Sequence, residues 1–236
     1  SDGKLYQFPT IFENVVYAST GLVMREDLLE AAGIDAESIQ TMDDLYNALA
    51  GIKEQNGGKP VLSARFGISN MSVIANMFGS SFAVRYDPKE MKFAYPVYDD
   101  GSKAAIQFLN RLYSDGILHP EWASMSDAIW EEAVSAGELA VYADNMQMLA
   151  ARNSDLSSSV GPEARLIPVL PPEVNGEIQP WGSNAAVMLG GWTSYAINAS
   201  VSGDKLERIL KVMNWIYDYE NSNEALVYGE EGVTFV

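Results

Sequence analysis

The sequence predicts an α/β fold, with a mixed β-sheet flanked by helices. Short apolar segments with strand character alternate with amphipathic helical segments along most of the 236 residues. No Gly-x-Gly-x-x-Gly fingerprint follows a predicted strand, which argues against a doubly wound dinucleotide-binding fold. No run of about 18 apolar residues is present, so no segment of this sequence is expected to span a membrane.

The first predicted elements show how the boundaries are assigned. A strand at residues 15–24 leads into a helix at residues 25–32, which Gly33 ends. Thr41 is expected to cap the next helix, because the two aspartates that follow it complement the helix dipole. A Gly-Gly pair ends that helix.

The remaining elements follow from hydrophobic periodicity. They are strands at residues 60–64, 139–143, 165–170 and 192–198, a hairpin at 82–95, and helices at 70–78, 102–114, 127–135 and from 144 or 145 to 152. The clearest helix is the last, where apolar residues recur at helical spacing: Leu206, Ile209, Leu210, Met213, Ile216 and Tyr217. Residues 153–161 are rich in serine and residues 174–191 in turn formers, so both segments are predicted to be loops.

Composition excludes several classes of function. The chain has 32 acidic and 15 basic residues and a formal net charge of −17, and a surface this acidic repels nucleic-acid phosphates. It has no cysteine and one histidine, His119, which is interpreted as an exposed loop residue. Disulfides and thiolate metal sites are therefore excluded, and a histidine-rich metal site or a Ser-His-Asp triad has too few histidines. No metal site, no cofactor and no nucleic-acid partner are expected.

Motifs for catalysis are also missing. The sequence holds no G-x-x-x-x-G-K-[ST], G-x-S-x-G or H-E-x-x-H. Adjacent carboxylates such as Glu131-Glu132 do not face each other on a helix, so we interpret them as solvated surface. No catalytic residue is assigned, and the protein is not expected to be an enzyme.

Aromatic and amide residues in loops after strands indicate a small-molecule cleft. Aromatic faces pack on the C–H surfaces of sugars, while amides and carboxylates bind the hydroxyl groups. Because ligands lie beyond the carboxyl ends of strands in α/β sheets, we expect these loops to line one concave side. The predicted ligand-binding residues are Phe12, Glu13, Asn14, Tyr17, Arg65, Phe66, Asn70, Asn145, Gln147, Trp181, Trp192 and Tyr195.

Several short motifs, in order, resemble those of family 1 extracellular solute-binding proteins, the group that contains maltose-binding protein. They are Asp2-Gly3-Lys4-Leu5-Tyr6-Gln7-Phe8-Pro9, Arg25-Glu26-Asp27-Leu28-Leu29, Thr41-Met42-Asp43-Asp44-Leu45, Gly137-Glu138-Leu139-Ala140-Val141, Val169-Leu170-Pro171-Pro172, Trp192-Thr193-Ser194-Tyr195-Ala196-Ile197 and Tyr228-Gly229-Glu230-Glu231-Gly232-Val233. The last is similar to lipoprotein relatives from Gram-positive bacteria. Asn145-Met146-Gln147 stands where the family has an aromatic residue, which argues against a maltodextrin ligand.

The resemblance implies a periplasmic-binding-protein-like (type II) fold, two lobes that close on a solute. Strand character at residues 4–8 and an apolar end at 232–236 lead us to expect a fragment: residues 1–236 as the second lobe, with a hinge-proximal segment at 1–14 and the first lobe largely absent. We also expect this chain alone to bind its solute weakly, because half of a two-lobed site is missing.

The resemblance implies an extracytoplasmic, monomeric carbohydrate-transport protein that is lipid-anchored at the cell surface. It would deliver a mono- or oligosaccharide to an ABC permease. Two alternatives stay open from the sequence: a carbohydrate-active enzyme, which would need an acid and a base in one pocket, and a sugar-sensing accessory domain.

Overall fold

The computed structural model describes residue 8 and residues 20–82, 84–87, 91–179 and 195–218. It also describes residues 220, 222, 225–226, 228–229 and 232–234. The chain divides into two compact units. We call residues 14–186 the larger unit, and residues 1–13 with 187–236 the smaller unit.

A four-stranded mixed sheet forms the centre of the larger unit, with strand order β2-β5-β1-β6. β2 (Leu62–Ala64) runs parallel to β5 (Val141–Asn145), and β1 (Thr20–Arg25) runs antiparallel to both β5 and β6 (Leu166–Pro168). This confirms the predicted mixed-sheet α/β fold. Of the predicted strand at residues 15–24, residues 15–19 lie outside the described part.

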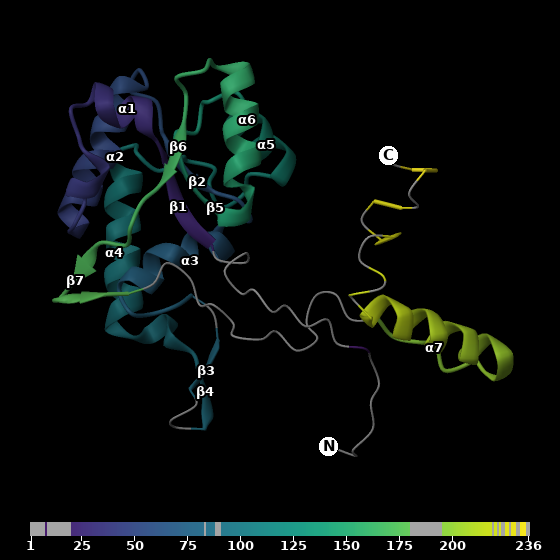
Figure 1. Cartoon of the computed structure of the whole chain (residues 1–236). Coiled ribbons are helices and arrows are strands. Elements are labelled where there is room, and N and C mark those ends of the chain that lie inside the picture. Colours follow the sequence, from purple (N-terminus) through teal and green to yellow (C-terminus); the bar gives the residue numbers. More distant parts are fainter. Residues whose placement is uncertain are drawn as a thin grey trace. The chain divides into compact units, whose positions relative to one another are not determined.

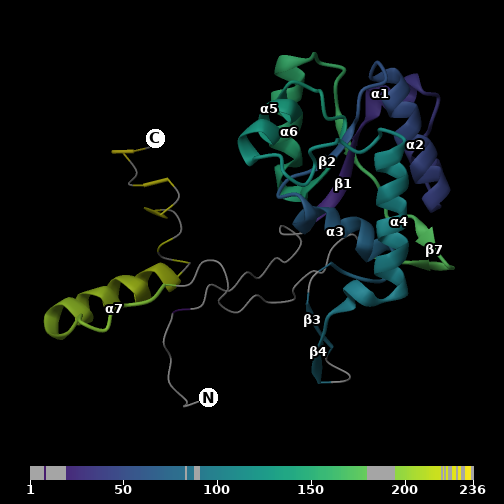
Figure 2. The same ribbon diagram turned by 180° about the vertical axis from the view of Figure 1, so that it is seen from behind.

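Helices cover both faces of this sheet. Figure 1 shows α1 (Glu26–Ala31), α2 (Met42–Gln55) and α4 (Asp100–Ser114) on one side, and α5 (Asp127–Ser135) and α6 (Leu149–Ser159) on the other. Figure 2 shows the same division from behind. α3 (Ile68–Met77) lies near the end of the sheet at which β1 begins (Figure 1).

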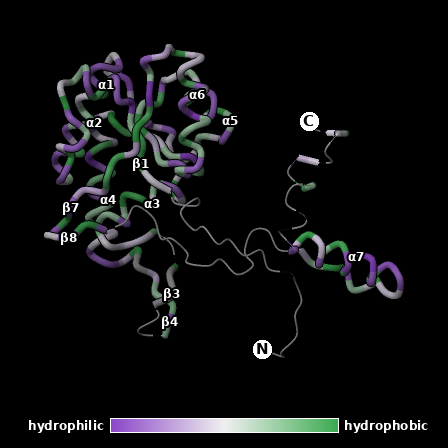
Figure 3. Tube along the Cα trace, viewed as in Figure 1, coloured by the Kyte–Doolittle hydropathy of each residue, from purple (hydrophilic) through white to green (hydrophobic). Residues whose placement is uncertain are grey.

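Two hydrophobic cores result from the alternation of side chains along β1. Leu22 and Met24 point into the larger core with α2, α3 and α4, whereas Val23 points into a smaller core with Trp130 and Tyr142. Successive side chains of a strand face opposite sides, so one strand serves both cores. Figure 3 shows hydrophobic residues concentrated along β1 and its neighbours.

Local signals explain most element boundaries. Thr41 caps α2 as predicted: its hydroxyl accepts a hydrogen bond from the Asp44 N–H, and the Asp44 carboxylate accepts one from the Thr41 N–H.

The predicted hairpin is confirmed as β3 (Arg85–Asp87) and β4 (Lys92–Ala94). A second hairpin, β7 (Glu173–Val174) with β8 (Glu177–Ile178), lies in the predicted loop. The described part of the unit also contains short 3₁₀ helices: η2 (Ala36–Ser38), η3 (Pro96–Tyr98) and η4 (Met146–Met148).

The predicted end of a helix at residue 152 and the loop at residues 153–161 are wrong. α6 continues to Ser159, because Leu156 is buried in the smaller core and requires helical backbone there. The serines fit the helix through their hydroxyl groups, as when Ser158 donates to the Ser154 carbonyl at 2.8 Å. Burial outweighs the low helix propensity of serine.

The smaller unit contains α7 (Gly203–Tyr217), which confirms the predicted last helix. Phe8 pairs with Tyr195 in an isolated bridge, and the Phe8 and Tyr217 rings lie 6.4 Å apart. The strand predicted at residues 192–198 is wrong in its described part, since only Tyr195 forms a bridge. In the part of the chain that the structure describes, no helix is long and apolar enough to cross a membrane.

Candidate ligand-binding site

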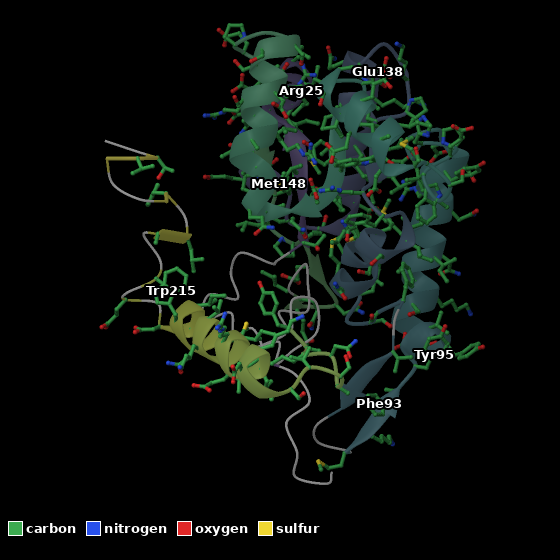
Figure 4. All side chains as sticks on the ribbon, turned by 90° about the vertical axis from the view of Figure 1, so that its right-hand side faces the viewer. Arg25, Phe93, Tyr95, Glu138, Met148 and Trp215 are labelled. Atoms are coloured by element: carbon green, nitrogen blue, oxygen red, sulfur yellow. The ribbon has the colours of Figure 1, made fainter. Side chains whose placement is uncertain are left out.

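Three strands of the larger unit meet at one edge of the sheet. β2 and β5 are parallel and end there, followed by Arg65 and by η4 respectively, while the antiparallel β1 begins there at Thr20. Thr20 lies opposite Asn145, and the Thr20 hydroxyl donates a hydrogen bond to Asn145 Oδ1 at 3.3 Å. We call this edge the strand-end site; Met148 lies toward this end in Figure 4, away from Arg25 and Glu138.

Four charged side chains form a cluster at the strand-end site, which we call the charge cluster: Arg65, Glu131, Asp144 and Arg152. Arg152 Nε donates to Asp144 Oδ2 at 3.3 Å, and Arg152 Nη2 donates to Glu131 Oε1 at 2.9 Å. Arg65 Nη2 lies 3.3 Å from Glu131 Oε1, and Arg65 Nη1 lies 4.0 Å from Asp144 Oδ1. The cluster therefore connects β2, α5, β5 and α6.

Burial and hydrogen bonding distinguish the side chains of this cluster. The Asp144 and Arg152 side chains are only 3% and 5% exposed. Hydrogen bonding from Arg152 lowers the pKa of Glu131, and the same bond raises the pKa of Arg152. Burial raises the pKa of the neighbouring Tyr142 hydroxyl, whose ring packs edge-on against Trp130 with centroids 5.2 Å apart. Glu131 and Arg152 therefore stay ionised at neutral pH.

Phe66 adds an exposed aromatic face beside the charge cluster. Its φ of 59° is in the left-handed region, which is rare for a bulky residue, and its side chain is 49% exposed. The Arg65 guanidinium lies 4.8 Å from the centre of the Phe66 ring. Strained backbone that holds an apolar ring in solvent is typical of functional sites.

The structure brings three of the predicted ligand-binding residues together, namely Arg65, Phe66 and Asn145. Gln147 is exposed in η4, directly after β5. Asn70 is buried in the first turn of α3, with its Nδ2 atom lacking an acceptor in the described structure. Tyr195 belongs to the smaller unit. The other predicted residues lie outside the described part: Phe12, Glu13, Asn14, Tyr17, Trp181 and Trp192.

Sequence reasoning missed three members of the charge cluster. Glu131 is not the solvated surface residue that its adjacent glutamate suggested, because it is bonded to Arg152. The spacing of Leu149, Arg152 and Leu156 was the available signal, since i, i+3 and i+7 positions place an arginine on the buried face of a helix. A buried arginine requires carboxylate partners.

Among the described residues, the strand-end site is an open surface. The cavity beside it, lined by residues that include Tyr142, Asp144, Met146 and Arg152, has a volume of about 10 Å³, which holds about one water molecule. A larger ligand would lie on the exposed side, against Phe66 and the partly exposed Arg65. Among the described residues, no group of three or more His, Cys, Asp or Glu side chains is placed to hold a metal ion.

No family model matches the sequence. Two curated proteins of Bacillus subtilis (strain 168) are each 24% identical to it. Lipoprotein LipO matches 90% of this chain over 42% of its own length, and the polygalacturonan/rhamnogalacturonan-binding protein YtcQ matches 99% of this chain over 46%. The chain therefore spans less than half the length of these relatives.

Solved structures show the same fold. Alginate-binding protein AlgQ2 matches 99% of this chain and 47% of its own, with a TM-score of 0.72 and 17% identity. The ABC-transporter substrate-binding protein FusA of S. pneumoniae, in complex with kestose, matches 76% of this chain and 38% of its own, with a TM-score of 0.59 and 18% identity. The described strands and helices thus follow the fold of these two binding proteins, in agreement with the mixed-sheet α/β fold expected from the sequence.

Proposed function

We propose that this chain binds a carbohydrate for delivery to an ABC importer. The observation that carries the proposal is the exposed Phe66 ring beside Arg65 at the strand-end site, on the fold of solute-binding proteins. An aromatic face packs on the C–H surface of a sugar ring, and Arg65, Asn145 and Gln147 supply polar groups for its hydroxyls. The ligands in the names of YtcQ, AlgQ2 and FusA are also carbohydrates.

A binding role fits the charge cluster better than catalysis does. General acid–base catalysis requires a carboxyl group that can hold a proton near neutral pH. Glu131 and Asp144 are both hydrogen-bonded to Arg152, and the pKa of Glu131 is lowered. Glu131 is therefore not available as a general acid near neutral pH.

The cellular role that we propose follows the relatives. The protein is extracytoplasmic and monomeric, lipid-anchored as the name of LipO suggests, and hands its solute to a membrane permease. In this proposal residues 1–236 provide mainly the second lobe of a two-lobed protein, and the strand-end site faces the cleft between the lobes. Because one lobe supplies about half of a micromolar binding energy, roughly 4 of 8 kcal/mol, the chain alone is expected to bind with a dissociation constant near millimolar.

Saturation-transfer NMR with a panel of mono- and oligosaccharides tests this proposal, because it detects millimolar binding. We expect at least one saccharide to bind the chain and NAD not to bind. Phe66→Ala should weaken saccharide binding, whereas Phe93→Ala, which removes an exposed aromatic on β4, should not; Figure 4 shows Phe93 on the β3–β4 hairpin, well away from Met148. Binding of NAD, or equal loss with both variants, would contradict the proposal.

A further inference from the structure

We propose that Arg65 binds a carboxylate group of the ligand. The preferred solute would then be an acidic saccharide that contains uronic acid. This inference rests on the proposed carbohydrate-binding function and narrows it to one substrate class. It is carried by the unused hydrogen-bonding capacity of Arg65 at an exposed strand end.

Arg65 and Arg152 differ in how their side-chain donors are used. Among the described residues its side chain donates no hydrogen bond, and its Nε atom is buried without an acceptor. Its distances of 3.3 and 4.0 Å to Glu131 and Asp144 are ion-pair contacts without hydrogen-bond geometry. A guanidinium has five N–H donors, and leaving them unsatisfied in a partly buried place is costly.

The position of Arg152 explains why the carboxylates do not satisfy Arg65. Arg152 donates to both Glu131 and Asp144 from the buried side, and its side chain is 5% exposed. The Arg65 side chain is 23% exposed and lies at the end of β2. Arg152 thus has a structural role, and Arg65 lies on the side of the cluster where we expect the ligand to bind.

A carboxylate matches this arrangement better than a neutral hydroxyl group. The planar guanidinium fork donates to two carboxylate oxygens at once, and such charge-assisted bonds are about twice as strong as neutral ones. The cluster carries two positive and two negative side chains, so its net charge of zero does not repel an anion. Phe66, 4.8 Å from the Arg65 guanidinium, adds an apolar face next to the carboxylate position on which a sugar ring can pack.

The experiment compares matched acidic and neutral saccharides on the 236-residue chain. The probes are trisaccharides of galacturonate, mannuronate and glucuronate, each paired with the neutral trisaccharide of the same linkage that lacks the carboxylates. Affinities are measured by NMR titration of the wild type, Arg65→Gln, Arg65→Lys and Arg111→Gln. Arg111 is the matched control, because its guanidinium also stacks on an aromatic ring, 3.5 Å from the centre of Tyr46, on another surface.

We expect the wild type to bind one acidic trisaccharide at least tenfold more tightly than its neutral partner. Arg65→Gln should lower the affinity for the acidic trisaccharide about 10- to 100-fold and the affinity for the neutral trisaccharide less than threefold. The affinity of Arg65→Lys for the acidic trisaccharide should lie between those of the wild type and Arg65→Gln. Arg111→Gln should change neither affinity. The Nε–Hε resonance of Arg65 should shift with the acidic trisaccharide only, a response that a purely structural arginine would not give.

The outcomes separate this inference from the proposed function. If neutral trisaccharides bind as tightly as acidic ones, or if Arg65→Gln weakens both equally, the inference is wrong and carbohydrate binding stands. If no member of either series binds, the proposed function fails together with the inference. If Arg65→Gln does not fold, two wild-type measurements still test the inference: the ratio of the affinities for acidic and neutral trisaccharides, and the shift of the Arg65 Nε–Hε resonance.

Discussion

Phe66 shows how a single backbone angle links stability to the proposed function. A left-handed φ of 59° disfavours every residue with a Cβ atom, so a bulky aromatic there is held against its intrinsic preference. Gly67 follows with a φ of 55°, and together they turn the chain from β2 into α3. We infer that this strain is retained because it presents the ring to the ligand.

The strain predicts that glycine is more stabilising than alanine at position 66, the reverse of the order found in helices. Phe66→Gly should be more stable than Phe66→Ala by about 1 kcal/mol, because only glycine adopts the left-handed region without a steric cost. Both variants remove the ring, so the comparison isolates the backbone. Urea unfolding of the two proteins measures the difference.

Gln107 provides the control for this comparison, because it is exposed in the middle of α4. There Gln107→Ala should be more stable than Gln107→Gly by about 1 kcal/mol, which is the usual helical order. If position 66 gave the same order as position 107, Phe66 would not be strained and its exposure would need another explanation.

Glu131 makes a pH-dependent contribution to stability. Its pKa is lowered from the ordinary value of 4.5, mainly by the hydrogen bond from Arg152. A carboxyl group whose pKa is lower in the folded state stabilises the protein above its ordinary pKa, and this contribution is lost as the pH falls through the lowered pKa. Glu131→Gln should therefore cost about 1 kcal/mol at pH 7, a modest value because solvent screens this partly exposed side chain.

Unfolding of wild type and Glu131→Gln between pH 7 and about pH 2 measures this effect. The difference between them should shrink as the pH falls. Glu132→Gln changes the exposed neighbour and should have little effect at any pH. A difference for Glu131→Gln that did not depend on pH would mean that the side chain acts through packing and not through its charge.

At the scale of elements, helix α4 depends on a close approach that only glycine allows. Gly101 lies in its first turn, and a Cβ atom there would lie 2.5 Å from the Phe78 carbonyl oxygen and 2.9 Å from Ser80 Cβ. Backbone and Cβ atoms cannot move aside as the tip of a long side chain can. The contact thus fixes the start of α4 against the end of α3.

Gly101→Ala should destabilise the protein by about 1–3 kcal/mol, although the same change in an open helix is stabilising by about 1 kcal/mol. Chemical denaturation of this variant measures the effect. Gln107→Ala serves as the reference and should stay within about 0.5 kcal/mol of the wild type. A stabilised Gly101→Ala protein would show that the two helices do not pack this closely.

Elements with strong local signals could be predicted from the sequence, and those set by burial could not. The cap at Thr41 and the apolar spacing of α7 depend on residues within one helix, and both predictions are confirmed. The second half of α6 reads as a serine-rich loop, and the packing of Leu156 against other elements makes it helical. That packing has no local signature.

At the scale of the whole molecule, the sheet order joins segments that are far apart in the sequence. β1 and β5 are neighbours although Thr20 and its partner Asn145 are 125 positions apart in the sequence, and no local pattern encodes such a pairing. The same holds for the charge cluster, which draws one residue from each of four segments. The sequence predicted that the loops carrying Arg65, Phe66 and Asn145 line one side of the sheet, but it did not predict the carboxylates and the arginine that join them.

Amide NMR mapping tests whether a saccharide binds at the strand-end site. The ¹⁵N-labelled chain is titrated with the saccharide that binds best in the panel. We predict that chemical-shift changes concentrate at Arg65, Phe66, Asn145 and Gln147. Changes centred instead on Arg25 and Glu138, toward the opposite end of the sheet in Figure 4, would show that the saccharide does not bind at the strand-end site.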